Sequence, residues 1–405
     1  MDVLAPFHAP ITCIDMHTTG EPTRIVIAGF PALSTPSTLL EQRAEARSQH
    51  DHIRKRLMLE PRGHYDMYGA VLRQDTELVR SGQAHIGVLF THNQGYSTMC
   101  GHATIALGRF LVDTHDPAVF PKREELVSDP VRQTTRVDIH APCGVVNVSV
   151  PTRQNERGVL VADSERDVSF ISTPAFASGI RVTVSIPEAR RWPELVAQGR
   201  RSVTLDVSFG GTFYALVSAR ELGFPTGLAR GRMDLDALSR CVTLLKAHLV
   251  EDEGFRKYIT HPVTPDYSFL YSVMVVDEEV GVVPAGADGA ETGLCFFADH
   301  QIDRSPTGSC VVARMALAYA KGIRKIGERW TYHSVVSNAF GGEGGFTASI
   351  TEEADVTDAQ GRVVAKGVRV CVEGRAFYTG SSTFVAETGD ATADSGFTMQ
   401  SVTQG

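Results

Sequence analysis

Two short stretches of the chain, STMCGHATIA at residues 97–106 and RSPTGSCVVA at residues 304–313, share the pattern that decides the fold. In both, a small or polar residue precedes a glycine, Gly101 or Gly308, and an apolar run with helical spacing follows. Such a pattern marks a helix start that leads into a buried helix. We therefore predict two similar halves, each with one such helix; the alternative is that short glycine turns align by chance.

A second pair of stretches supports this repeat. HTTGEPTRIVIAGFP (17–31) and SFGGTFYALVSARELG (208–223) each place a small, polar, glycine-containing turn next to an apolar strand. Other β-branched or alternating runs predict further strands, and runs with helical spacing predict helices. The predicted strands are 24–30, 85–90, 144–150, 202–209, 213–219, 268–276 and 368–380, and the predicted helices are 39–59, 102–111, 234–250 and 310–321. The fold class that follows is α+β.

The composition is that of a globular chain. At roughly 100 to 200 residues per domain, the 405 residues predict two to three domains. Hydrophobic residues make up 42%, charged residues 21%, and the net charge is −8, which excludes a strongly basic nucleic-acid binder and a disordered chain. No apolar run approaches the ~18 residues that cross a bilayer, and residues 1–21 lack the features of a secretion signal. We expect a cytoplasmic protein without a nucleic-acid or membrane partner.

The cysteines point to thiol chemistry rather than to disulfides or zinc. Seven of them are scattered along the chain without CxxC spacing. Cys100 stands where a helix begins, and free backbone N–H groups with a partial charge of roughly +0.5 stabilise a thiolate there. Cys100 is therefore a candidate base or nucleophile. The alternative is a buried, inert thiol, which is common for cysteine.

Two helix starts that face each other would suit a small anionic substrate. Its carboxylate would bind backbone N–H groups from both helices, and one side chain would approach each face of its α-carbon. That arrangement favours removal of the proton next to the carboxylate. Asp303 could bind a substrate ammonium group, or be a loop acid or helix cap. His102 could contact the substrate or the Cys100 thiol, or be a structural histidine.

Motifs for other chemistries are absent from the sequence. There is no phosphate-binding GxxxxGK[ST], no dinucleotide-binding GxGxxG after a strand, no zinc-binding HExxH and no GxSxG of serine hydrolases. The sequence predicts no cofactor and no metal.

Five stretches, taken together, resemble the proline racemase family. They are DMHTTGEPTRIVIAGFP (15–31), EPRGHYDMYGAVL (60–72), GYSTMCGHATIALGRF (95–110), SFGGTFYALV (208–217) and DRSPTGSCVVARMALAYAKG (303–322), and the likeness runs in order from about residue 11 to residue 380. The resemblance implies a diaminopimelate-epimerase-like fold: two α/β halves, each a curved sheet or barrel around a central helix, with the active site in the cleft between them. It also implies a cofactor-independent enzyme and a homodimer. The halves would be residues 1–165, joined by C-terminal strands at about 366–405, and residues 166–365.

Within this family the second motif decides the reaction. Racemases and hydroxyproline epimerases carry a cysteine in both motifs, whereas this sequence has Cys100 in the first and Thr307 in the second. The pattern resembles that of family members that dehydrate trans-3-hydroxy-L-proline to Δ1-pyrroline-2-carboxylate. The chemistry agrees, because a threonine hydroxyl holds its proton far more tightly than a thiol with a pKa near ~8.5. Cys100 would take the α-proton, and the carbanion would expel the 3-hydroxyl as water.

The resemblance also implies the site residues. Cys100 and Thr307 would be catalytic, with Thr307 near the departing hydroxyl. The substrate contacts would come from the residues beside them: Gly101, His102, Asp303, Gly308 and Ser309.

Two other functions remain open from the sequence. A proline or 4-hydroxyproline epimerase would need a second acid, which could be a water or Cys310, three residues after Thr307. The apolar run after Cys310 favours buried packing instead. A non-catalytic imino-acid-binding protein would bind the same ligands without exchanging their α-proton.

Overall fold

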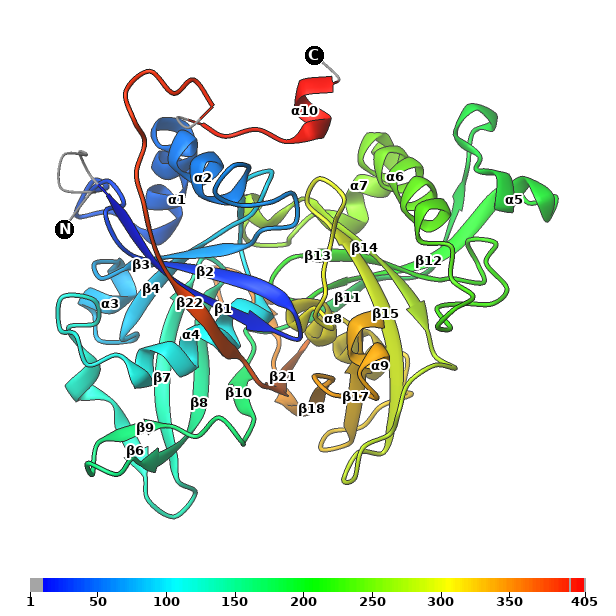
Figure 1. The fold of residues 1–405 in the computed structure, drawn as a ribbon. Helices are drawn as coiled ribbons and strands as arrows, with labels where there is room; N and C mark the ends of the chain where they lie inside the picture. The colour runs from blue at the N-terminus through cyan, green and yellow to red at the C-terminus, as the bar shows by residue number, and fades with distance from the viewer. Residues whose placement is uncertain (1–9, 393–394, 404–405) are drawn as a thin grey trace. The chain divides into compact units, whose positions relative to one another are not determined.

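The computed structural model describes residues 10–392 and 395–403, which form two compact units. Unit 1 contains the described residues up to Phe170 and from Gly374 onward, and unit 2 contains Ile171–Glu373. Both units combine strands and helices (Figure 1). Residues 1–9, part of the segment 1–21 in which the sequence lacks the features of a secretion signal, lie outside the described residues. Among the described residues, no helix has both the length and the apolar character needed to span a membrane.

Unit 1 is a curved sheet around one buried helix. The antiparallel pair β1 (Ile11–Thr18) and β2 (Glu21–Ala28) is extended by β22 (Phe377–Phe384), β3 (Gly69–Arg73), β4 (Ile86–Thr91), β7 (Thr134–Ala141) and β8 (Gly144–Gln154). Helix α4 (Gly101–Asp113) contacts β1, β2, β7 and β8. Every residue of α4 except Arg109 and Asp113 is buried, so this is a central helix of the predicted kind (Figure 1).

Unit 2 has the same architecture, a sheet around one buried helix, but with more strands. They are β11 (Phe176–Ser185), β12 (Ser202–Phe209), β13 (Phe213–Ser218), β14 (Leu270–Asp277), β15 (Gly289–Phe297), β17 (Arg329–His333), β18 (Phe346–Glu353) and β21 (Val368–Gly374). Helix α8 (Gly308–Ala320) contacts β11, β12 and β18, and all but its last two residues are buried. Helix α6 (Leu235–Glu251) packs on β14 with an apolar face that includes Leu238, Leu245 and Leu249.

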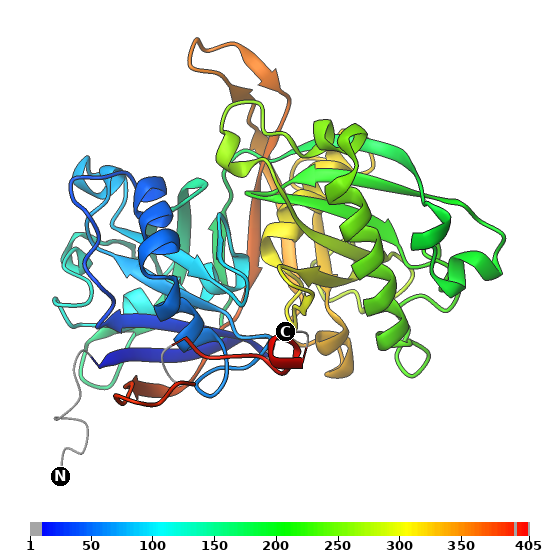
Figure 2. The ribbon, with the colours of Figure 1, turned by 90° about the horizontal axis from the view of Figure 1, so that it is seen from above.

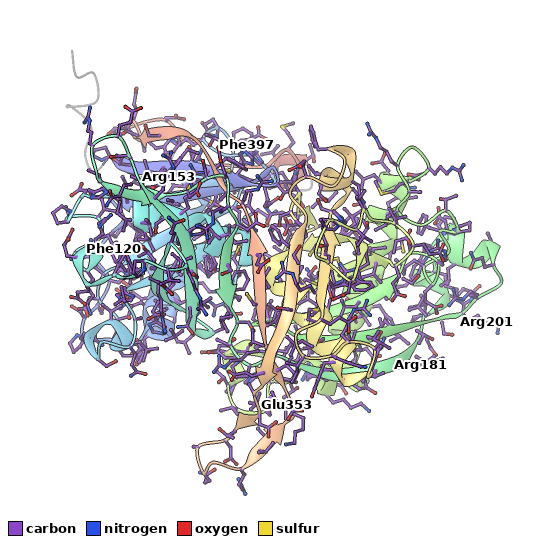
Figure 3. The ribbon with its side chains drawn as sticks, turned by 90° about the horizontal axis from the view of Figure 1, so that it is seen from below. Phe120, Arg153, Arg181, Arg201, Glu353 and Phe397 are labelled. Carbon is purple, nitrogen blue, oxygen red and sulfur yellow. The ribbon has the colours of Figure 1, made fainter. Side chains whose placement is uncertain are left out.

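A small hairpin leaves the body of unit 2. It consists of β19 (Val356–Thr357) and β20 (Val363–Ala365), which pair with each other in a separate sheet. Figure 2 shows it projecting from the unit, and Figure 3 labels Glu353 at its base. The hydroxyl of Tyr319, on α8, donates to the Glu353 carboxylate, which ties this base to the central helix.

The repeat predicted from the sequence is present in the structure. The stretches 17–31 and 208–223 contain the turns of the hairpins β1–β2 and β12–β13 together with the second strand of each. The motif with Cys100 begins α4 and the motif with Thr307 begins α8, and each helix is 13 residues long. Local signals therefore predicted these elements correctly.

Two predicted elements differ from the structure. The predicted helix 39–59 is two helices, α1 (Leu39–Gln49) and α2 (Asp51–Met58), because His50 leaves the helical region at φ −125° and ψ 16°. The predicted strand 368–380 is also two strands, since β21 pairs with β18 in unit 2 and β22 pairs with β1 in unit 1. The alternation of apolar and polar residues along a strand does not reveal where the strand changes its pairing partner.

Candidate active site

Cys100 is the N-cap residue of α4, and its sulfur takes the place of the usual capping oxygen. The backbone is extended at Cys100, with φ −147° and ψ 116°, and Sγ accepts a hydrogen bond from the Ala103 N–H at 3.4 Å. Thr104 fixes the same turn, because its Oγ1 donates to the Cys100 carbonyl at 2.6 Å. The thiol therefore lies at the positive end of a 13-residue helix, where its ionised form is favoured.

The His102 ring is a neutral neighbour of this thiol. Its Nδ1 lies 3.3 Å from Cys100 Sγ. Burial lowers the pKa of His102 to about 3, while a hydrogen bond to the Pro22 carbonyl acts in the opposite direction. One ring N–H therefore donates to Pro22, and the other ring nitrogen can only accept.

Residues near the turn between β1 and β2, together with Tyr68, also hold His102 in place. Thr18 Oγ1 donates to the His102 carbonyl at 3.1 Å, and the ring of Tyr68 meets the His102 ring edge to face at 4.7 Å. Glu21, in the same turn motif, has no exposed surface. We did not single out these three residues from the sequence, although all lie within stretches quoted for the family resemblance. Their burial in a polar cluster is a property of the fold and has no local sequence signal.

Thr307 begins α8 in a strained conformation. Its φ of 64° and ψ of 79° lie in the left-handed region, which is a genuine outlier for a β-branched residue. Its side chain makes no capping hydrogen bond to α8; instead Oγ1 donates to Asp303 Oδ2 at 2.8 Å. The Thr307 N–H donates to Ser305 Oγ at 3.1 Å, which fixes the turn. Strain of this kind is concentrated at functional sites.

Asp303 is a buried carboxyl group that accepts hydrogen bonds from its own loop. It is 3% exposed, and its Oδ1 accepts from the Ser305 N–H at 2.7 Å while its Oδ2 accepts from Thr307. Burial raises the pKa of Asp303 to about 6, although the hydrogen bonds from Ser305 and Thr307 and the charge of Arg304 lower it in part. A carboxyl group with such a pKa is mostly charged at neutral pH and can accept a cation.

Behind Thr307 lies a thiol that sequence reasoning missed. Burial raises the pKa of Cys295, on β15, to about 12, while hydrogen bonds with Ser272 and Thr307 lower it in part. The Ser272 hydroxyl lies 2.9 Å from Cys295 Sγ. This thiol stays protonated at neutral pH and extends the polar cluster beneath the helix start.

Gly308 and Ser309 form the first turn of α8 and are held against β12 and β13. The Ser309 hydroxyl lies 2.6 Å from the Tyr214 hydroxyl. A Cβ atom on Gly210 would lie 2.2 Å from the Ser309 carbonyl oxygen, so only glycine lets β12 approach the helix this closely. The turn is therefore fixed by packing as well as by hydrogen bonds.

The predicted site residues fall into two groups. Cys100, Gly101 and His102 lie together at the start of α4 in unit 1, and a second group lies at the start of α8 in unit 2: Asp303, Thr307, Gly308 and Ser309. Cys310 has no exposed surface and burial raises its pKa well above the ordinary value, so it is not an available acid in unit 2. Within residues 10–392 and 395–403, no group of three or more His, Cys, Asp or Glu side chains is arranged to hold a metal ion.

Known proteins resemble the chain over almost its whole length. The family model described as proline racemase matches residues 13–398. A trans-3-hydroxy-L-proline dehydratase from Homo sapiens is 39% identical over 98% of this chain and 97% of the relative, and a trans-L-3-hydroxyproline dehydratase from Xenopus tropicalis is 38% identical over 98% of each. Among solved structures, a hydroxyproline epimerase from Agrobacterium vitis, with bound trans-4-hydroxy-L-proline, has a TM-score of 0.74 at 20% identity, covering 98% of this chain and 96% of the other. This last likeness confirms the predicted fold.

Proposed function

The chain belongs to the proline racemase family, and from this premise we propose that it is a hydro-lyase that converts trans-3-hydroxy-L-proline to Δ1-pyrroline-2-carboxylate and water. The relatives that carry this activity in their names cover nearly the full chain at 38 to 39% identity. Further support comes from the unlike chemistry of the two helix starts, which suits an elimination better than an inversion.

The difference between Cys100 and Thr307 is the single observation that carries the proposal. Inversion at Cα needs one group to remove a proton and a second group to return one to the opposite face. The thiol of Cys100 can do the first. The Thr307 hydroxyl is a far weaker acid than a thiol, and it already donates its hydrogen to Asp303. The carbanion therefore loses its 3-hydroxyl instead of gaining a proton.

In the proposed mechanism the Cys100 thiolate removes the α-proton. The backbone N–H groups at the two helix starts, from Gly101 and His102 and from Gly308 and Ser309, bind the substrate carboxylate, where negative charge develops as the proton leaves. Fixed N–H dipoles in a site that excludes water stabilise such charge strongly. The electron pair on Cα then forms the Cα=Cβ bond as the C–O bond breaks.

Asp303 binds the ring nitrogen in this proposal. The hydrogen bonds from Ser305 and Thr307 hold this carboxylate in place at the start of α8, and a carboxylate is an acceptor suited to a substrate N–H. The positive ring nitrogen also keeps Asp303 charged against the effect of burial. Once the hydroxyl has left, the product enamine tautomerises to the cyclic imine.

Proton NMR in D2O tests the function directly. The purified protein is incubated with trans-3-hydroxy-L-proline, trans-4-hydroxy-L-proline and L-proline, and each compound is followed separately. We expect conversion of the 3-hydroxy compound alone, to the cyclic imine. Inversion of either of the other two would overturn the assignment and would make it an epimerase, while binding without exchange of the α-proton would make it a binding protein.

A cytoplasmic location and a homodimer are further parts of the proposal. The location is inferred from the composition and patterning of the sequence, and the homodimer from the family resemblance. Light scattering after size-exclusion chromatography distinguishes a dimer from a monomer of 43.9 kDa.

A further inference from the structure

In trans-3-hydroxy-L-proline the α-hydrogen and the 3-hydroxyl lie on the same face of the ring. The hydroxyl is trans to the carboxylate by definition, and the α-hydrogen is also opposite the carboxylate. The proposed reaction is therefore a syn elimination. The acid that protonates the departing hydroxyl must stand on the face from which the α-proton leaves, which is the face that Cys100 serves in the proposed function.

The Cys100 sulfur has a partner for each of its protonation states. As a thiolate it accepts the Ala103 N–H at 3.4 Å. As a thiol it can donate to the His102 ring, whose Nδ1 lies 3.3 Å away. His102 itself has no proton to give, because its ring is neutral and its N–H donates to the Pro22 carbonyl. The sulfur is thus the group at this helix start that can both take up and release a proton.

Thr307 is poorly suited to act as the acid. Its single hydroxyl hydrogen is donated to Asp303 Oδ2 at 2.8 Å, within a buried turn that Ser305 fixes. An inversion would need the second-motif residue on the opposite face of the α-carbon, and Thr307 occupies that motif position. This inference therefore replaces the expectation that Thr307 lies near the departing hydroxyl. Thr307 then affects the reaction because it is not a second thiol that could reprotonate the α-carbon, and it does not contact the leaving group.

We propose that Cys100 performs both proton transfers, so that the α-hydrogen of the substrate leaves in the product water. The thiolate takes the α-proton, an S–H bond forms, and the C–H electron pair stays on Cα. That pair forms the Cα=Cβ bond, the C–O bond breaks with its electrons on oxygen, and the S–H proton passes to that oxygen. The products are the enamine and water, and the thiolate is restored without any other reactant. This inference rests on the proposed function and adds a stereochemical rule: the site eliminates only a 3-hydroxyl on the face of the α-hydrogen.

The first test compares two stereoisomers with the unmodified protein in D2O. In cis-3-hydroxy-L-proline the hydroxyl lies on the face opposite the α-hydrogen. We expect Cys100 to exchange the α-hydrogen of this isomer for deuterium, while its dehydration is at least about a hundredfold slower than that of the trans isomer, which is the lower range for loss of a general acid. Dehydration of the two isomers at rates within tenfold of each other would overturn the inference.

The second test removes the Thr307 hydroxyl. Thr307→Gly suits the left-handed backbone at φ 64°, so we expect this variant to fold. If Cys100 returns the proton, this variant loses less than about a hundredfold in the dehydration rate, and if Thr307 is the acid it loses more. Failure of the proposed function gives a different result, because the unmodified protein would then leave trans-3-hydroxy-L-proline unchanged.

Discussion

Replacing Asp303 with asparagine is expected to stabilise the folded protein, and to do so mainly at neutral and alkaline pH. Burial raises the pKa of Asp303 from 3.8 to about 6. Each pKa unit corresponds to about 1.4 kcal/mol, so the ionised carboxylate costs the folded state about 3 kcal/mol. Asparagine has the same shape and no charge. It keeps an oxygen for the Ser305 N–H and can donate to Thr307 Oγ1 through its amide.

The sign of the pH dependence follows from proton binding. Between about pH 4 and pH 6 the folded protein holds a proton on Asp303 that the unfolded chain has lost, so the stability of the unmodified protein falls as the pH rises through this window. The advantage of the asparagine variant should therefore be smaller at pH 5 and grow to about 3 kcal/mol at pH 8.

Urea unfolding at these two pH values measures the difference. The exposed residue Asp266 offers a matched control, since Asp266→Asn removes a charge that is not buried and should give no such gain. An advantage of Asp303→Asn that is equal at both pH values, or a loss of stability at pH 8, would refute the reasoning. The stabilised variant should also be impaired as an enzyme, because the proposed partner of the ring nitrogen has lost its charge.

Three further changes test other parts of the site. Thr307→Cys adds a thiol at the second helix start and should produce inversion at Cα of proline or 4-hydroxyproline, measured by chiral chromatography; no inverted product would count against the two-thiol explanation. Cys100→Ser should slow dehydration by more than about a thousandfold. The control Cys371→Ser changes a half-buried cysteine of β21 and should leave the dehydration rate unchanged. Equal rates for the two variants would remove Cys100 from the mechanism. Gly210→Ala places a Cβ atom against the Ser309 carbonyl and should cost about 1–3 kcal/mol in urea unfolding, with a fall in activity; unchanged stability would mean that the first turn of α8 moves freely.

The central elements of the fold could be predicted because their signals are local. A glycine after a small polar residue, followed by a long apolar run, predicts a buried helix, and α4 and α8 begin within two residues of the predicted positions. The break at His50 and the change of partner strand near Arg375 have no comparable signal. Both depend on which distant segment packs against the chain, and a single alternating pattern is compatible with either partner.

The candidate site was predictable in its residue types but not in its hydrogen bonds. The motifs identify Cys100 and Thr307, yet the left-handed backbone at Thr307 and its bond to Asp303 appear only in the structure. The same is true of Cys295, on the preceding long strand β15, and of Tyr214, on the distant strand β13, which both reach the start of α8. Buried polar clusters of this kind are assembled by tertiary packing, so periodicity along the chain cannot reveal them.

The two helix starts differ in which group receives the hydrogen bonds of the first turn. At α4 the Cys100 sulfur accepts the Ala103 N–H, and ionisation of the thiol strengthens that bond because the acceptor becomes charged. At α8 the Thr307 hydroxyl is turned back to Asp303 and does not cap the helix. The threonine side chain therefore leaves the first N–H groups of α8 to other acceptors, and a substrate carboxylate is such an acceptor. The left-handed strain at Thr307 thus has a function in the proposed mechanism, since a normally capped threonine would compete with the substrate for those same N–H groups.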